Sequence, residues 1–173
     1  VLQVSPDVKI EESLTALILV MSMNCSKPVL SDLRVRQAIN HAIDKQKVLD
    51  VAYNGGKPIG TFMDYGNAYY RDFADLYPYD PEKAKKLLAE AGVGKDTTFN
   101  LFLPQNYELH VKAGEMYQAM LTKVGLNVKI KLVDWSTWIS DVYRGGKYDL
   151  TVIGHTGKLD PDGTLGSYGT KKR

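Results

Sequence analysis

The apolar residues recur with a helical period in several stretches of the chain. Val35, Ala38, Ile39 and Ala42 are spaced by three and four residues, which predicts the apolar face of an amphipathic helix. Residues that favour helix caps precede this stretch and several others, and glycines end most of them. We therefore expect helices after Asp32, Asp44, Asp80 and Ser136, and one from about Glu108 to Val124.

Other stretches alternate between apolar and polar positions, as strands do. In NVKIKLVD the apolar side chains are expected to face the core and the lysines to face solvent, a pattern that suits an edge strand. The inner positions are Val128, Ile130 and Leu132, and the outer ones are Lys129 and Lys131. TFNLFLP and YDLTVIG are predicted as two more strands, and the apolar run from Leu14 to Met23 as a buried one.

Strands and helices alternate from Thr98 onward, which is the order of a βαβ arrangement. The predicted fold class is therefore α/β. In such sheets ligands bind at the carboxyl ends of the strands. Three polar segments follow the predicted strands: PQNYE with Gln105 and Asn106, DWSTW with Trp135, and GHTGKLDPDG with His155. These segments are expected to form a binding edge.

The composition fits one domain without a polyanionic partner such as a nucleic acid. The chain has 173 residues, a net charge of +2 and one cysteine, Cys25, so no internal disulfide can form. Because Cys25 follows an apolar run, we expect it to be a small core residue. That run is too short to span a bilayer. Both chain ends resemble the interior of a longer polypeptide, so we expect a fragment.

The segment VIGHTGKLDPDGT lacks the spacing of common metal and phosphate motifs. A phosphate loop needs a glycine five residues before Gly157, where Val152 stands. A calcium loop that begins at Asp160 would need a glutamate where Lys171 stands. The histidines and the cysteine show no zinc spacing, and there is no nucleophile elbow. We therefore expect no metal, no cofactor and no catalytic residue, and Asp160 and Pro161 could simply form a turn.

Aromatic side chains are further candidates for ligand contact. Trp135 directly follows a predicted strand, so it could face a ligand, and flat rings suit sugars and peptides. Trp138 and Tyr143 are expected in the core. Tyr69 belongs to a tyrosine-rich stretch without periodicity between Lys57 and Tyr79, which could line a cleft or cover the core.

Four segments, in order, resemble motifs of a known family. They are LSDLRVRQAINHAIDKQKVLD, YPYDPEKAKKLLAEAG, MYQAMLTKVGLNVKIKLVDWSTW and KYDLTVIGHTGKLDPDG. They are similar to segments of the family 5 (peptide, nickel and oligosaccharide type) extracytoplasmic solute-binding proteins, which serve ABC transporters. The resemblance covers most of the chain from Leu30 to Gly163. It implies one lobe of a type II periplasmic-binding-protein-like fold, with a mixed sheet flanked by helices.

The resemblance also implies a two-lobed protein that closes over its ligand. This chain would be most of the C-terminal lobe, without the N-terminal lobe. Residues 1–30 would form a hinge-crossing sheet segment, and residues 31–173 the α/β ligand-binding lobe. The protein would be periplasmic or otherwise extracytoplasmic, and its partners would be a small solute, an ABC permease and the missing lobe. Exposed lobe–lobe surface could also make the isolated chain dimerise.

The loop after the last strand departs from the family pattern at two positions. His155 stands where peptide-binding members have tryptophan, and Lys158 stands where they have the acidic residue that receives the α-amino group of the peptide. A lysine would repel an α-ammonium group. His155, Thr156, Lys158 and Asp160 suit a neutral polyol, so an oligosaccharide is the expected ligand. An oligopeptide is the alternative, with Asp160 or Asp162 in the acidic role.

The expected function is non-catalytic capture of a solute for an ABC permease. An enzyme on the same scaffold would need a nucleophile and a base within reach, and turnover of saccharides or peptides would reveal it. An interaction module would instead use Lys129 and Lys131 to face a partner.

Overall fold

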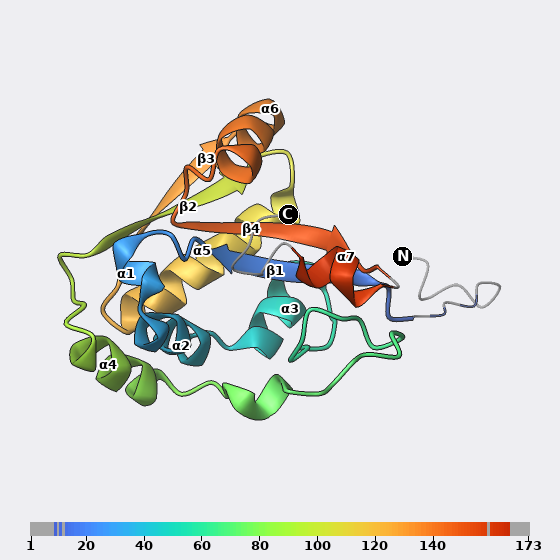
Figure 1. The fold of residues 1–173 in the computed structure, drawn as a ribbon, viewed down its shortest axis with the longest axis horizontal. Helices are drawn as coiled ribbons and strands as arrows, with labels where there is room; N and C mark the ends of the chain where they lie inside the picture. Colours follow the sequence, from blue (N-terminus) through green and yellow to red (C-terminus); the bar gives the residue numbers. More distant parts are fainter. Residues whose placement is uncertain (1–8, 10, 12, 159, 167–173) are drawn as a thin grey trace.

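The computed structural model describes residues 9, 11, 13–158 and 160–166, which form a four-stranded sheet with helices on both faces (Figure 1). The strands are β1 (Leu17–Met23), β2 (Thr98–Pro104), β3 (Asn127–Val133) and β4 (Leu150–Thr156). Their order is β1-β4-β2-β3; β4, β2 and β3 are parallel, and β1 is antiparallel to β4. The prediction of an α/β fold with a mixed sheet is confirmed.

The helices follow the predicted order along the chain. They are α1 (Pro28–Ser31), α2 (Leu33–Ala42), α3 (Lys45–Tyr53), α4 (Pro81–Glu90), α5 (Glu108–Lys123), α6 (Trp135–Thr137), the π-helix η3 (Trp138–Arg144) and α7 (Pro161–Leu165), with a 3-10 turn η2 (Ala74–Leu76). Asp32, Asp44 and Asp80 cap α2, α3 and α4 as expected. The cap after β3 is Asp134 instead of Ser136, because the Asp134 carboxylate accepts a hydrogen bond from the N–H of Thr137 (3.0 Å).

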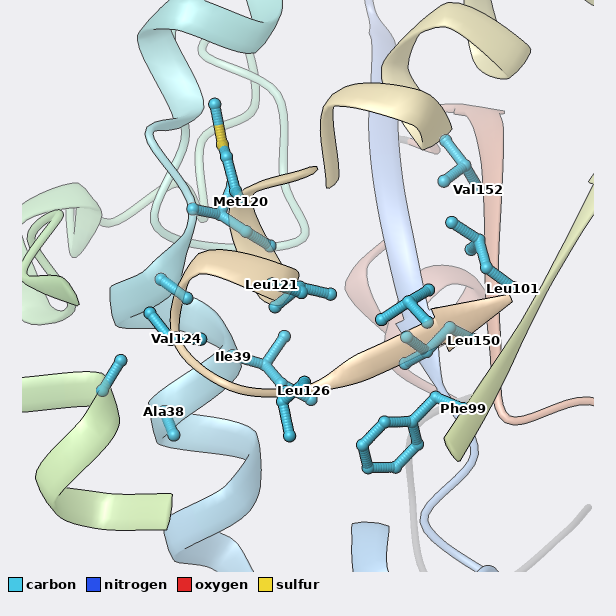
Figure 2. Packing of buried hydrophobic residues seen from close by; sticks show 14 of the residues in the cluster. Ala38, Ile39, Phe99, Leu101, Met120, Leu121, Val124, Leu126, Leu150 and Val152 are labelled. Atoms are coloured by element: carbon cyan, nitrogen blue, oxygen red, sulfur yellow. The ribbon is translucent and has the colours of Figure 1, made fainter. Parts of the chain in front are cut away.

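The main core lies between one face of the sheet and the helices α2 and α5. Ile39, Leu101, Leu121 and Leu150 come from α2, β2, α5 and β4, and all are fully buried in one cluster (Figure 2). The predicted apolar stripe of α2 is thus the face that meets the core. On the opposite face of the sheet, a smaller cluster centred on Trp138 packs η3 against β4.

Three predictions about burial in the strands and in the turn after β1 were wrong, each at the margin of the sheet. β3 is an edge strand as expected, but Leu132 is exposed because α5 packs on the earlier part of β3, where Val128 is buried. In β1 only Ile18 is buried, because β1 is the opposite edge strand. Cys25 is exposed because it lies in the turn after β1.

β1 ties the start of the chain to the same sheet as the later residues, since all seven of its residues pair with β4. In the described part of the chain no strand pairs with its outer side. The proposed boundary near residue 30, the crossing to a second lobe and dimerisation of the isolated chain therefore stay predictions.

Replacing Leu101 with alanine should destabilise the protein by about 2–5 kcal/mol, because a buried leucine leaves a cavity that the core cannot fill. Leu132→Ala is the matched control on the neighbouring strand, and it should cost less than about 1 kcal/mol because Leu132 is exposed. Urea unfolding followed by circular dichroism measures both. Equal losses for the two variants would contradict this description of the core.

Candidate functional site

The carboxyl ends of β2, β3 and β4 lie at one end of the sheet, where β1 begins. The N–H of Gln105, just after β2, donates to the carbonyl of Val133 at the end of β3 (2.9 Å). β4 is longer than predicted: His155 and Thr156 lie in the strand and pair with β1, so they are not part of the following loop. The structure therefore brings the three predicted segments to the same end of the sheet, which is the binding edge expected from the sequence.

β4 separates from β2 soon after it begins (Figure 1), and we call this point the β2–β4 fork. The ladder between the two strands ends at the pair Phe102–Thr151. At the fork, the indole N–H of Trp138 donates to Oγ1 of Thr151 (3.0 Å), and the Thr151 hydroxyl donates to the carbonyl of Phe102 (2.7 Å). Beyond it no described strand pairs with the β2 side of Val152–Thr156. This side of β4 is a free strand edge, and its accessible part is Gly154–Thr156, because Val152 and Ile153 are buried.

Aromatic rings from α6 and η3 form a wall beside the free edge. The rings of Trp135 and Trp138 stack with centroids 5.2 Å apart and planes 3° apart, and Tyr143 stacks with Trp138 at 6.0 Å and 19°. The π-helical geometry of η3 brings residues five apart onto one face, which aligns Trp138 with Tyr143. Trp138 is buried as predicted, but Tyr143 is exposed because it stands at the outer end of this row.

A cavity of about 210 Å³ lies between the aromatic wall and the end of β4. Its lining residues are Trp135, Trp138, Ile139, Tyr143, Ile153, Gly154 and His155. Desolvation by burial lowers the pKa of His155, and the positive charge of Lys158 lowers this pKa further, which favours the neutral imidazole. With no carboxylate, lysine or arginine in its lining, the cavity suits an aliphatic or aromatic group.

Two of the predicted ligand-binding groups form bonds within their own loop. Nζ of Lys158 donates to the carbonyl of Gly163 (2.9 Å). The Asp160 carboxylate accepts from the N–H of Asp162 (2.8 Å) and caps α7, as the simple turn interpretation expected. Thr156 is exposed at the end of β4. Any ligand contact by Lys158 or Asp160 therefore stays a prediction and would have to accommodate these local bonds.

Three other predicted ligand-binding residues do not line the cavity. Gln105 and Asn106 are exposed at the binding edge, and the Tyr69 ring is exposed on the connection between α3 and α4. A different part of that connection reaches β4, because the rings of Phe62 and His155 lie 5.8 Å apart. Sequence reasoning missed Phe62, since composition was the only signal in a stretch without periodicity.

A larger concavity of about 430 Å³ lies beside the start of α3, and no strand residue lines it. Its lysines already have partners: Lys45 donates to the carbonyl of Tyr77 (2.9 Å), and Lys57 lies 4.3 Å from the centre of the Tyr65 ring. Its other charged lining residues are Asp44, Asp72 and Asp75, and the carboxylates of Asp44 and Asp72 accept hydrogen bonds from backbone N–H groups of their own turns. The cavity at the carboxyl ends of the strands is therefore the better candidate for a ligand site.

The described residues lack two further features. They contain no group of three or more histidine, cysteine, aspartate or glutamate side chains that could hold a metal ion. None of their helices combines the length and the apolar character that crossing a membrane requires.

Comparison with known proteins identifies the family of this chain. A family model described as "Bacterial extracellular solute-binding proteins, family 5 Middle" matches residues 1–173. The dipeptide-binding protein of Escherichia coli K12 is 34% identical over 148 residues, which are 82% of this chain and 28% of the relative. The chain thus spans less than a third of that relative's length. Proteins of this family are extracytoplasmic solute-binding components of transport systems, not enzymes.

Solved structures give the same fold. The dipeptide-binding protein of Pseudoalteromonas sp. SM9913, in complex with Met-Leu, is 28% identical with a TM-score of 0.79, and the match covers 95% of this chain and 33% of that one. AgaA from A. tumefaciens R10, in complex with agropinic acid, is 32% identical with a TM-score of 0.79, over 88% of this chain and 31% of the other. The chain therefore has the fold of part of a type II periplasmic binding protein.

Thr151→Val should destabilise the protein by about 1–3 kcal/mol, because it leaves the Trp138 N–H and the Phe102 carbonyl at the fork without their partner. Thr122→Val is the control, since the Thr122 hydroxyl bonds a carbonyl of its own helix at an exposed position. Denaturant unfolding measures both changes. A loss for Thr151→Val no larger than that for Thr122→Val would show that the fork does not need this bond.

Proposed function

Because this chain belongs to family 5 of the bacterial extracellular solute-binding proteins, we propose that it forms one wall of a ligand site in a two-lobed, extracytoplasmic protein that delivers its ligand to an ABC permease. Residues 31–173 would supply most of this lobe, and residues 1–30 would lead to the other lobe. Ligand bound between the lobes would stabilise the closed state.

We propose a short peptide as the ligand. The observation that carries this proposal is the accessible part of the free edge, Gly154–Thr156, beside an apolar cavity. An extended peptide can pair its backbone N–H and C=O groups with a free strand edge while one of its side chains enters a neighbouring pocket. Relatives named as dipeptide-binding proteins, and the one in complex with Met-Leu, support the same ligand class.

The oligosaccharide predicted from the loop has weaker support. A polyol needs several donors and acceptors around it, but Lys158 and Asp160 already form bonds within the loop. The groups that line the cavity are mostly apolar. The peptide alternative therefore replaces the oligosaccharide as our proposal.

We assign the proposed peptide contacts by position. Trp135 and His155 would contact a side chain in the cavity, with Tyr143 at its rim. Gln105, Asn106 and Thr156, exposed at the same edge, would bond the backbone or termini of the peptide. Tyr69 would contribute only through a surface contact with the second lobe.

The 173-residue chain alone should bind peptides only at millimolar concentrations, because half of the contacts and the exclusion of water by lobe closure are missing. Affinity should therefore be measured by calorimetry on the full natural polypeptide that contains this sequence. We expect it to bind a dipeptide or tripeptide with a leucine or phenylalanine side chain and not to bind a short β-linked oligosaccharide.

Trp135→Ala in this polypeptide should weaken binding of such a peptide about tenfold, because the cavity loses one aromatic wall. Phe73→Ala removes another exposed ring, from a surface outside the cavity, and should leave the affinity unchanged. Tight saccharide binding without peptide binding would refute the proposed ligand class.

A further inference from the structure

We propose that Asp64 accepts the α-ammonium group of the bound peptide, an inference that rests on the proposed peptide ligand. A free peptide carries a positive charge at its amino terminus, and this charge needs a carboxylate when the site closes and excludes water. Lys158, in the loop after β4, cannot supply one. Asp64 lies far from this loop in the sequence, but the fold brings it to the end of β4.

Close packing places the Asp64 carboxylate against Gly157, the residue that follows β4. A Cβ built on Gly157 would lie 2.5 Å from Oδ2 of Asp64, so this approach requires glycine at that position. Gly157 is itself fixed, because its N–H donates to the carbonyl of Ala16 (2.7 Å). The carboxylate therefore stands beside the strand end and not in open solvent.

Two other contacts attach the connection between α3 and α4, which contains Asp64, to the end of β4. The side-chain amide of Asn67, which is buried, donates to the carbonyl of Lys158 (3.0 Å). The ring of Phe62 packs on His155. These contacts lie on either side of Asp64 in the sequence. They hold the backbone before and after Asp64 in place, and with it the position of the carboxylate. Figure 1 shows this connection, in blue-green to green, passing close to the end of β4 and α7.

One oxygen of the Asp64 carboxylate can accept a hydrogen bond from a ligand. Oδ1 accepts a hydrogen bond from the N–H of Gly66 (3.0 Å), which orients the side chain. Among the described residues, no hydrogen bond or ion pair is formed by Oδ2. Asp64 is half-buried, so a charge-assisted bond there is less screened than at an exposed site. Asp160, one of the two alternative acids in the loop, already caps α7.

The distance along β4 between Gly157, beside Asp64, and His155, beside the cavity, suits a short peptide. Gly157 and His155 are two residues apart, which is about 7 Å along an extended chain. An ammonium group at Asp64 would therefore leave the first or second side chain of the peptide level with the cavity that His155 lines. One carboxylate and one apolar pocket would then fix the amino-terminal end of the peptide.

The test compares a dipeptide that has a free amino group with its N-acetylated form, by calorimetry on the full natural polypeptide. Wild type should bind the free form at least about tenfold more tightly. Asp64→Asn keeps the oxygen that accepts from Gly66 but removes the charge, so it should bind both forms with nearly equal affinity. Gly157→Ala should displace the carboxylate and lower the preference for the free amine in the same direction.

Asp72→Asn is the matched control, because Asp72 lies on the same connection and its Oδ1 accepts from the N–H of Ala74 in the same local turn. It should retain the wild-type preference for the free amine. If Asp64→Asn also retains it, Asp64 is not the partner and the inference fails while the peptide proposal stands. If neither form binds to wild type, the peptide proposal itself fails.

Discussion

The hydrogen-bonded path from Trp138 through Thr151 to Phe102 is the interaction on which this site depends. Where two strands part inside a protein, a backbone carbonyl loses its partner, and an unpaired buried group is costly. The buried Thr151 hydroxyl supplies that partner, and the Trp138 indole satisfies the hydroxyl in turn. β2 can therefore remain with β3 while β4 continues beside β1. The free edge, the aromatic wall and the cavity all lie in the space that this separation opens.

The sequence predicted the parts of the fold that depend on local patterns. The stripe of α2, the caps at Asp32, Asp44 and Asp80, and the alternation of strands and helices each follow from residues close together in the chain. The same patterns predicted which edge of the sheet would carry the candidate site, because parallel strands end together.

The details of the site depend on contacts between distant segments, which periodicity does not encode. Nothing near Trp138 in the sequence indicates that its indole meets Thr151, and nothing near Asp64 indicates that it packs on Gly157. Local propensity also misled us at the sheet margins, where Leu132 has an inward-facing position in the pattern but lies beyond the reach of the core. Similarly, the polar character of Lys158 and Asp160 suggested ligand contacts, whereas both side chains bond their own loop.

The departures from the family pattern at His155 and Lys158 are easier to understand in this arrangement. His155 still presents a flat ring to the cavity, and Phe62 packs against it, so the aromatic character of the position is kept. Our assignment moves the acidic function from the loop after β4 to a different connection. A binding site can in this way keep the charge that its ligand requires while the residue that carries the charge changes position in the sequence.

The parallel stack of Trp135 and Trp138 has a consequence for spectroscopy. The chain contains two tryptophans, and both line the cavity. Tryptophan dominates the intrinsic emission of a protein, and the two rings stack with centroids 5.2 Å apart, so the tryptophan emission of this chain comes from a single place. The lobe therefore carries an optical reporter at its candidate binding surface, and it needs no attached dye.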